Sequence, residues 1–382
     1  MRTVIKIEAL FFAIMMIFSL SVCVFAEEEL PFDVNAKSAV LMEASTGTVL
    51  YSKNADEPLP PASVTKVMTL LLVMESVDSG TLGFDEQVSV SEYAASMGGS
   101  QVFLEPGEQM SVEELIKCVV IASANDAAVA LAEKVAGSET AFVSMMNERS
   151  ASLGLKNSRF ENVTGLDDDT VDHVMSANDI AVISRELMKH EKIFEFSKTW
   201  MDSIRNGSFG LTNTNRLIRF YSGATGLKTG STSKAKFCIS ATAERNGMHL
   251  IAVIMGSETR DTRNEAAKQL LDWGFANYTL YRNDGGKVGE IKVKGGKKDI
   301  TGVNCPPIVM LLPKQKQGTV SPEYLFKSDV EAPVKAGDQV GEVRYLSGEE
   351  VISSAPLTVS ESVERVGYFD VLSGIIKSLF LK

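Results

Sequence analysis

The sequence predicts a mixed α/β (α+β) domain followed by a small all-β domain, on three observations. Strand-like segments lie near both ends of the first 281 residues, at 37–52 and again at 237–256. Several segments with helical periodicity lie between them. After about residue 281, short Val- and Lys-rich segments punctuated by paired glycines replace the helical patterns. Helices inserted between early and late strands are typical of α+β domains, and runs of short alternating segments are typical of all-β domains.

The elements of the first domain follow in a simple order. KSAVLMEA from Lys37 and TVLYS from Thr48 flank the turn Ser45–Gly47 and predict a β-hairpin. The apolar segment SVTKVMTLLLVMESV from Ser63 predicts a buried helix. Further helices are expected at 112–121, 126–136, 139–153, 177–188 and 264–275, and strands at 237–243 and 249–256.

Composition limits the classes of protein to consider. The 382 residues are 45% apolar and 23% charged, which is usual for a folded chain and argues against a disordered, collagen-like or multi-span membrane protein. At roughly 150 residues per domain, the length allows two or three domains. The net charge of −11 argues against nucleic acid as a partner, because binding phosphates requires a basic surface.

The N-terminus resembles an export signal. A basic start and an uncharged apolar run at 9–26 predict a signal peptide over 1–26, with cleavage after Ala26; an uncleaved membrane anchor is the alternative. Cleavage would leave Cys118, Cys238 and Cys305. An odd, sparse set does not predict a disulfide framework, so buried free thiols are expected. No CxxC or HExxH motif occurs, and no metal site or cofactor is expected.

The C-terminal segment 361–382 contains an amphipathic helix. Its apolar positions recur at helical spacing, and polar residues fall on the opposite side. The helix is too short and too polar to span a bilayer. It either packs on its own domain or lies in the membrane interface. The apolar positions are Tyr368, Phe369, Leu372, Ile375, Ile376, Leu379 and Phe380.

An SxxK pattern, Ser63 to Lys66, begins the predicted buried helix. Residues i and i+3 share a helix face, so the hydroxyl and the amine point the same way. A serine nucleophile needs an adjacent base, and lysine serves only when burial or a second cation holds it neutral. Alone the pattern is weak, because Ser63 also fits as a helix N-cap.

Two further patterns follow along the chain. SAN at Ser123–Asn125 lies between two predicted helices, where a hydroxyl and a carboxamide can face one cleft; helix capping is the alternative. GLKTGS at Gly226–Ser231 precedes a predicted strand and offers a cation, a hydroxyl and close backbone access to an extended ligand. A solvated edge strand, where lysine is common, is the alternative there.

Together, SxxK, SxN and KTG form the motif set of penicillin-binding proteins and class A β-lactamases. With FLEPGEQMSVEELI from Phe103, MMNERSASLGLKNSRFENVTGL from Met145 and RNEAAKQLLDWGF from Arg263, the chain resembles the serine-type D-alanyl-D-alanine carboxypeptidases of peptidase family S11, which are low-molecular-mass penicillin-binding proteins. The resemblance implies the penicillin-binding/β-lactamase-like serine transpeptidase fold: an antiparallel sheet with helices on both sides and a helical insert. It also implies removal of the terminal D-alanine from peptidoglycan pentapeptide stems ending in D-Ala-D-Ala, and covalent inhibition by β-lactams.

The resemblance further implies a role for each motif residue. Ser63 would attack the peptide carbonyl and form an acyl-enzyme, and Lys66 would accept its proton. Ser123, held near Lys66 with Asn125 close by, would pass a proton to the leaving D-alanine. His173 matches a family position without an assigned role.

The KTG segment would bind the substrate, through Lys228, Thr229, Gly230 and Ser231. The lysine and the threonine would hold the terminal carboxylate, with Arg263 near the same pocket. The backbone N–H groups of Ser63 and Ser231 would form the oxyanion hole. Lys228 would also help to keep the catalytic lysine neutral.

Three other functions share these motifs. A β-lactamase needs a glutamate that activates the deacylating water, and ENVTGLDDDT after Phe160 resembles the carboxypeptidases instead. An endopeptidase that opens peptidoglycan cross-links uses the same chemistry, and the sequence does not separate the two. A catalytically silent wall-binding scaffold is disfavoured by the intact motifs.

The expected organisation is therefore a signal peptide (1–26), a catalytic domain (27–281), a small β-rich domain (282–360) and a membrane-associating helix (361–382). Both ends predict an exported protein at the outer face of the cytoplasmic membrane, next to the cell wall. TGLKTGSTSKAKFCISATA is similar to Gram-positive, sporulation-type members, which implies a role in spore wall synthesis.

Overall fold

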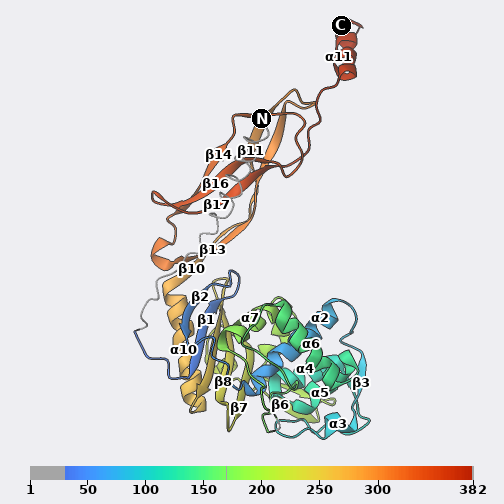
Figure 1. The fold of residues 1–382 in the computed structure, drawn as a ribbon, viewed down its shortest axis with the longest axis vertical. Helices are drawn as coiled ribbons and strands as arrows, with labels where there is room; N and C mark the ends of the chain where they lie inside the picture. The colour runs from blue at the N-terminus through green and yellow to red at the C-terminus, as the bar shows by residue number, and fades with distance from the viewer. Residues whose placement is uncertain (1–30, 169, 381–382) are drawn as a thin grey trace, which may run out of the picture. The chain divides into compact units, whose positions relative to one another are not determined.

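The computed structural model describes residues 31–168 and 170–380, so the predicted signal peptide lies outside the described residues. A five-stranded antiparallel sheet, in the order β2-β1-β9-β8-β7, forms the frame of the catalytic part (Figure 1). The predicted hairpin is confirmed, because β1 pairs with β2, and the strands expected at 237–243 and 249–256 are β8 and β9, which pair with each other. The strands are β1 (Ser38–Glu43), β2 (Val49–Lys53), β7 (Ala224–Thr232), β8 (Lys236–Arg245) and β9 (Met248–Ser257).

A helical insert separates β2 from β7 in the chain. The α-helices are α2 (Lys66–Asp78), α3 (Glu92–Ala95), α4 (Val112–Lys117), α5 (Asn125–Ala136), α6 (Glu139–Ser152), α7 (Ala177–Leu187), α8 (Ile193–Ser197) and α9 (Leu217–Phe220), and α10 (Arg260–Asn277) follows the sheet. Short hairpins are formed by β3 (Gln87–Ser89) with β4 (Gln109–Ser111) and by β5 (Met201–Ile204) with β6 (Phe209–Thr212).

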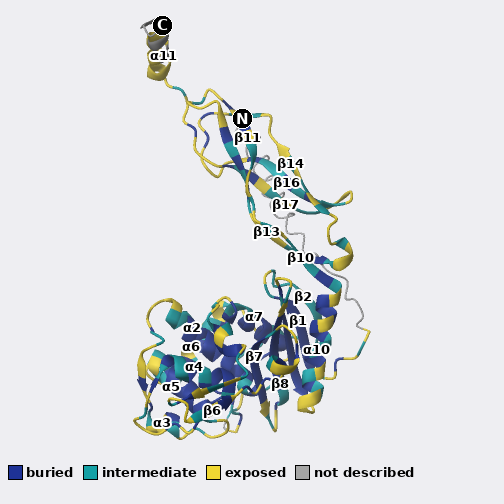
Figure 2. Ribbon diagram, turned by 180° about the vertical axis from the view of Figure 1, so that it is seen from behind, coloured by how far each residue is buried: buried dark blue, intermediate teal, exposed yellow. Residues whose placement is uncertain are grey.

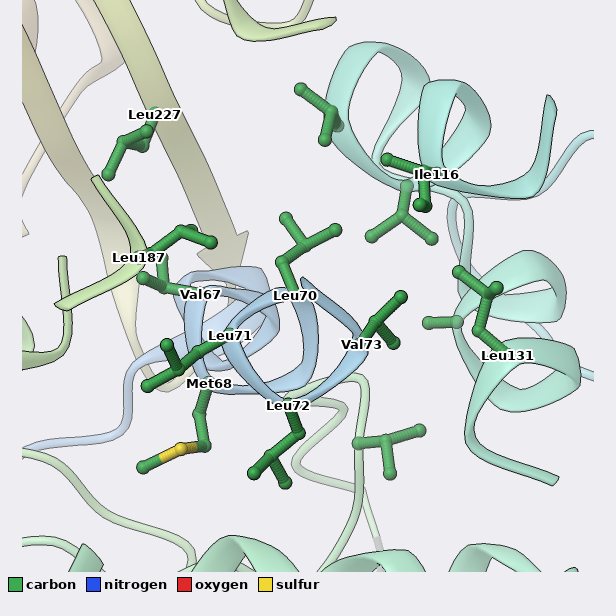
Figure 3. Packing of buried hydrophobic residues seen from close by; sticks show 14 of the residues in the cluster. Val67, Met68, Leu70, Leu71, Leu72, Val73, Ile116, Leu131, Leu187 and Leu227 are labelled. Atoms are coloured by element: carbon green, nitrogen blue, oxygen red, sulfur yellow. The ribbon is translucent and has the colours of Figure 1, made fainter. Parts of the chain in front are cut away.

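Helix α2 lies at the centre of the insert. All nine residues over Lys66–Met74 are buried, and a helix buried on every side is typical of the middle of a domain. Figure 3 shows its Leu and Val side chains surrounded by Leu187 of α7, Ile116 of α4, Leu131 of α5 and Leu227 of β7. The helix that begins at the SxxK motif is thus held from several directions.

Helices cover both faces of the sheet. On one face, an ideal Cβ at Gly274 of α10 would lie 2.6 Å from the Leu250 side chain, so glycine is what permits this close helix. On the other face, Ser184 of α7 shares a 2.7 Å hydrogen bond with Ser240 of β8. Figure 2 shows the resulting burial of β1, β7 and β8 with α7. Burial on both faces explains the near-continuous apolar sequences of β8 and β9.

Two of the predicted helices are interrupted where the motifs lie. The helix expected from Ser63 begins as a 3₁₀ turn, η1 (Ala62–Thr65), and becomes α-helical at Lys66. The helix expected at 112–121 ends as α4 at Lys117 and continues as a π turn, η2 (Cys118–Ala122). Irregular turns of this kind are common at functional sites.

The chain after α10 forms β-structure, as predicted. A six-stranded sheet has the order β14-β16-β17-β12-β11-β15, and β10 pairs with β13. Its core centres on Val303, Val343, Tyr345 and Leu357. The strands are β10 (Tyr278–Asn283), β11 (Gly286–Lys294), β12 (Ile300–Cys305), β13 (Ile308–Pro313), β14 (Val320–Phe326), β15 (Asp329–Glu331), β16 (Gln339–Ser347) and β17 (Glu350–Val359), with a 3₁₀ turn η3 (Lys314–Lys316).

A final helix, α11 (Tyr368–Phe380), agrees with the helical spacing of the tail. Tyr368, Phe369 and Ile375 on it are exposed. No helix within 31–168 and 170–380 is long and apolar enough to cross a membrane. Of the four cysteines in the sequence, the three among the described residues, Cys118, Cys238 and Cys305, are buried and free, as expected.

Candidate active site

The three motifs meet around one cavity of about 660 Å³. Ser63 comes from η1, Ser123 from the loop between η2 and α5, and Thr229, Gly230 and Ser231 from the edge strand β7. Lys66, Asn125 and Lys228 are buried directly behind them. The cavity is lined by Ser63, Ser100, Ser123, Trp200, Thr212, Asn213, Thr214, Arg216, Phe220, Thr229, Gly230, Ser231, Arg260 and Arg263.

The SxxK pair is in contact, as the spacing predicted. The Nζ atom of Lys66 lies 3.0 Å from Oγ of Ser63. The N-cap alternative for Ser63 is wrong, because η1 is capped at Pro61 and has no side-chain cap hydrogen bond. Ala62, just before the serine, has a φ of 49°, a backbone conformation that is strained for a residue with a side chain. The serine therefore lies on a tight turn held by the surrounding structure.

Lys66 has two further partners. Its amine donates to Oδ1 of Asn125 at 2.6 Å and to the backbone carbonyl of Thr164 at 2.7 Å. Asn125 is held in turn, because its Nδ2 donates to the carbonyl of Gly98. Two of the three oxygens around the amine can only accept hydrogen bonds, and only the Ser63 hydroxyl can also donate. A neutral amine, with two N–H groups and one lone pair, satisfies all three contacts.

The electrostatic surroundings favour that neutral amine. Complete burial lowers the pKa of Lys66 well below its usual value, and the positive charge of Lys228 lowers it further. The buried carboxylate of Asp126 acts in the opposite direction. This carboxylate accepts hydrogen bonds from the backbone of Val102 and Leu104, so it fixes the loop that carries Ser100 rather than pairing with the lysine.

The SxN serine is hydrogen-bonded to the second lysine of the site. Oγ of Ser123 accepts a 2.7 Å hydrogen bond from Lys228, whereas the motif's asparagine is what contacts Lys66. Ser123 has a φ of 64°, which turns the chain sharply between η2 and α5. The capping alternative is wrong here too, because α5 is capped by Ala124 without a side-chain hydrogen bond.

Lys228 is a buried lysine on an edge strand, so the solvated-edge alternative is wrong. Only 1% of the residue is exposed, and burial, with the nearby charge of Arg263, lowers its pKa to about 7. Next to it, the hydroxyl of Thr229 donates to Oγ1 of Thr214 at 2.9 Å. Arg263 lines the same cavity, as expected, and so does Arg260, which no sequence motif indicated.

Gly230 has to be glycine at this position. An ideal Cβ there would lie 2.9 Å from the backbone N of both Ser63 and Val64 and from the carbonyl oxygen of Pro61. Such contacts with backbone atoms cannot be relieved by moving a flexible side chain. Strand β7, which carries the KTG motif, therefore approaches the 3₁₀ turn η1 too closely to allow a side chain at position 230.

Thr164 and His173 contact residues of the SxxK motif. The Thr164 carbonyl contacts Lys66, and His173 shares a 2.8 Å hydrogen bond between its Nε2 and Oγ1 of Thr65. Nδ1 of His173 accepts the N–H of Glu161. With Nδ1 as an acceptor, the ring is the neutral Nε2–H tautomer, and burial lowers its pKa to about 4. His173 thus holds Thr65 at the end of η1, the turn that carries Ser63.

Comparison with known proteins identifies the family. A family model described as D-alanyl-D-alanine carboxypeptidase, Peptidase S11, matches residues 24–259. The chain belongs to this family. A second model, the C-terminal domain of penicillin-binding protein 5, matches residues 275–365. The chain is a serine-type D-Ala-D-Ala carboxypeptidase and penicillin-binding protein with the fold that the motifs implied.

Relatives of this carboxypeptidase cover nearly all of it. The D-alanyl-D-alanine carboxypeptidase DacF of Bacillus subtilis is 44% identical over 345 residues, 88% of each chain. The structure of penicillin-binding protein 5 from Haemophilus influenzae has a TM-score of 0.76 and 31% identity, covering 88% of this chain and all of that one. Penicillin-binding protein D2 of Listeria monocytogenes, solved with ampicillin bound, has a TM-score of 0.59 and 30% identity, covering 64% of this chain and all of that one.

Several site residues have no signal in the sequence motifs. They are Thr164, Thr214, Trp200, Arg216, Phe220 and Arg260. Thr164 contributes a backbone carbonyl, which any residue type would supply. Arg260 begins α10 immediately after Thr259, whose capping box with Thr262 marks the helix start at the end of strand β9. The capping box predicts that a helix begins at Arg260, and it is the one sequence signal that could have placed this arginine at the end of the sheet.

Proposed function

We propose that this carboxypeptidase works through Ser63 as nucleophile and a neutral Lys66 as its base. The observation that carries the proposal is the set of three oxygens within hydrogen-bond distance of the buried Lys66 amine. Two of them can only accept, and they take the two N–H groups of a neutral amine, which leaves its lone pair directed at the Ser63 hydroxyl. The hydroxyl proton moves to Nζ as Oγ attacks the carbonyl of the penultimate D-alanine. The N–H groups of Ser63 and Ser231 stabilise the oxyanion, and the close approach of β7 at Gly230 favours this pairing.

The second serine–lysine pair completes the cycle. Ser123, hydrogen-bonded to Lys228, passes a proton to the nitrogen of the leaving D-alanine. Lys228, Thr229 and the neighbouring Arg260 bind the terminal carboxylate of the pentapeptide, and that negative charge favours the protonated form of Lys228. Water then hydrolyses the ester on Ser63 and releases the shortened peptide.

Deacylation after penicillin is expected to be slow. None of the described residues that line the cavity is Asp or Glu. The carboxylate of Glu161 accepts hydrogen bonds from the N–H groups of Val171 and Asp172, so both of its oxygens already have partners in the same loop. A carboxylate ready to activate water is the feature a β-lactamase needs, so penicillin should remain attached.

The experiment measures D-alanine release from a pentapeptide ending in D-Ala-D-Ala and labelling by a fluorescent penicillin. Wild type should do both, with a labelled band that persists. Ser63→Ala should lose both, and Ser208→Ala, an exposed serine on the β5–β6 turn, should lose neither. Retained release in the Ser63 variant would show that another residue is the nucleophile.

The ends of the chain support a location at the outer membrane surface. The tail 361–382 presents exposed apolar side chains on α11, and burying each in the interface would contribute roughly 1.5–3 kcal/mol. Together with the predicted signal peptide over 1–26, this supports export followed by anchoring of the tail. The domain limits 27–281 and 282–360 and the spore wall role remain predictions of the sequence.

A further inference from the structure

One contact of Lys66 comes from a backbone group rather than from a motif side chain. The carbonyl oxygen of Thr164 accepts a hydrogen bond from Nζ of Lys66 at 2.7 Å. It is one of the two oxygens near the amine that can only accept. A backbone carbonyl points where its peptide unit points, so the residues that orient this unit also decide how the lysine amine is held.

The side chain of Asn162 holds the other side of that peptide unit. The N–H of Gly165 belongs to the same planar unit as the Thr164 carbonyl, and in a trans peptide the two point in opposite directions. This N–H donates to Oδ1 of Asn162 at 2.7 Å, while the carbonyl accepts from Lys66. A single peptide unit therefore joins the Asn162 side chain to the lysine amine.

Asn162 makes further hydrogen bonds within the same turn. Its Oδ1 also accepts from the N–H of Thr164 at 3.1 Å and from the Thr164 hydroxyl at 3.2 Å, and its Nδ2 donates to the carbonyl of Leu166 at 2.8 Å. An asparagine side chain that accepts from the backbone two residues ahead stabilises a turn. Asn162 therefore binds this turn at three successive residues.

The turn lies directly against η1, which carries Ser63. Gly165 has a φ of 80°, and an ideal Cβ there would lie 1.8 Å from the carbonyl oxygen of Ala62 and 2.7 Å from Oγ1 of Thr65. Glycine is therefore what allows the Thr164–Gly165 unit to approach the SxxK motif this closely. The unit that Asn162 orients thus lies beside the nucleophile turn as well as beside the lysine.

Both ends of the turn are held by other parts of the fold. At the near end, the carbonyl of Val163 accepts a 2.7 Å hydrogen bond from the buried hydroxyl of Thr69 on α2. At the far end, Oδ2 of the buried Asp167 accepts from the hydroxyl of Thr232, the last residue of β7. With its ends fixed to α2 and to the KTG strand, the turn depends on Asn162 for the orientation of the peptide unit between them.

We propose that Asn162 is a positioning residue for the Lys66 base and that it acts through the Thr164 carbonyl. The proposal rests on the acyl-enzyme mechanism proposed above. When the carbonyl and Asn125 each take one N–H of the neutral amine, its lone pair is directed at the Ser63 hydroxyl. Without the Asn162 hydrogen bond the carbonyl turns away and the amine rotates, so the lone pair no longer points at the proton that it has to accept.

The test measures acylation of the mature protein by a fluorescent penicillin at increasing concentrations, which separates the first-order acylation rate from the dissociation constant of the preceding complex. Asn162→Ala should lower the acylation rate by about tenfold or more, because the base is misdirected. The dissociation constant should change little, since Lys228 and Thr229 are untouched. The loss should persist at high pH, because deprotonation does not redirect a lone pair.

Asn162→Asp supplies a second, different signature. It keeps an oxygen for the Gly165 N–H but places a negative charge one peptide unit from the Lys66 amine. The carboxylate should raise the pKa of Lys66, so the acid limb of the acylation rate should move to higher pH and the rate at high pH should approach that of wild type. Both variants lose the hydrogen bond to Leu166, so the difference between them isolates the oxygen.

The matched control is Asn283→Ala. Oδ1 of Asn283 accepts the N–H of Gly285 at 2.8 Å in a similar turn of the β-rich part, and its loss should leave the acylation rate unchanged.

The proposal is overturned if Asn162→Ala is acylated at the wild-type rate, or if only its dissociation constant changes. Should Asn162→Ala fail to fold, an acid limb of Asn162→Asp at the wild-type pH overturns the proposal. If wild type is not acylated, or if Ser63→Ala is, the Ser63 mechanism itself fails.

Discussion

The amine of Lys66 donates a 2.6 Å hydrogen bond to Oδ1 of Asn125, so the SxxK and SxN motifs meet through the asparagine. A neutral carboxamide at this place adds no charge, so the pKa of Lys66 is set by burial and Lys228, which lower it, against Asp126, which raises it. A negative charge there would instead favour the ammonium form, which cannot accept the Ser63 proton.

Asn125→Asp tests this relationship with almost no change of shape. The new carboxylate should raise the pKa of Lys66, so the rate of penicillin acylation at pH 7 should fall by about tenfold or more and recover as the pH rises. The measurement is the acylation rate across pH. Asn246→Asp, on the exposed β8–β9 turn, is the control. An unshifted acid limb in the Asn125 variant would refute a neutral lysine base.

Gly230→Ala tests the close approach of β7 to the nucleophile turn. The added methyl would lie 2.9 Å from backbone atoms of Pro61, Ser63 and Val64, so the turn must move. A shift of the order of 1 Å at a reacting group can reduce the rate by about a hundredfold. Gly210→Ala, where a Cβ meets nothing within 4 Å, is the matched control. Equal acylation rates for the two variants would contradict the packing argument.

The sequence predicted which residues form the site better than it predicted which of them hydrogen-bond one another. Ser63 and Lys66 lie three residues apart, so local helical geometry was enough to bring them together. Lys66 with Asn125, and Lys228 with Ser123, are separated by 59 and 105 residues, and the pairing depends on how the insert folds on the sheet. The left-handed turn at Ser123, which aims its hydroxyl at Lys228, has no periodic signal.

The fold was predictable for a similar reason. Hairpins such as β1–β2 and long helices such as α5 and α6 follow from short-range patterns, and their observed limits lie within a residue or two of the prediction. The 3₁₀ and π turns at Ala62 and Cys118 are set by packing against α2, β7 and β6, so the continuous helices expected there were wrong in detail.

The protonation of His173 should make the free energy of unfolding depend on pH. Its pKa is about 4 in the folded chain and 6.5 when unperturbed, so the unfolded chain binds the proton first. The stabilising difference is complete above about pH 6.5 and is lost as the pH falls toward 4. From pH 7 to pH 5 it amounts to about 2 kcal/mol of unfolding free energy.

His173→Gln should therefore flatten the decline of the unfolding free energy between pH 7 and pH 5, measured by urea denaturation. His249, whose pKa burial also lowers to about 4, provides an internal replicate, and the double variant should show both effects. A decline as steep in His173→Gln as in wild type would show that the ring is protonated in the folded chain.

The tail makes a prediction about location. Removing residues 361–382 should release the mature protein from membranes while leaving D-alanine release by the soluble fraction unchanged, since no described residue of the tail lines the cavity. The measurement is the distribution between membrane pellet and supernatant after fractionation. A truncated protein that remains in the pellet would mean that another segment provides the anchor.

The site contains two serine–lysine pairs, and the mechanism assigns the nucleophile to only one of them. Identifying the serine that is acylated is therefore the most direct test of the mechanism. Ser63 lies beside Lys66 and Ser123 beside Lys228, and both serines line the same cavity. Tandem mass spectrometry of the mature protein after brief exposure to penicillin would locate the covalent adduct. The mechanism predicts a single adduct on the peptide containing Ser63, retained at a reduced rate in Ser123→Ala; an adduct on Ser123 would contradict it.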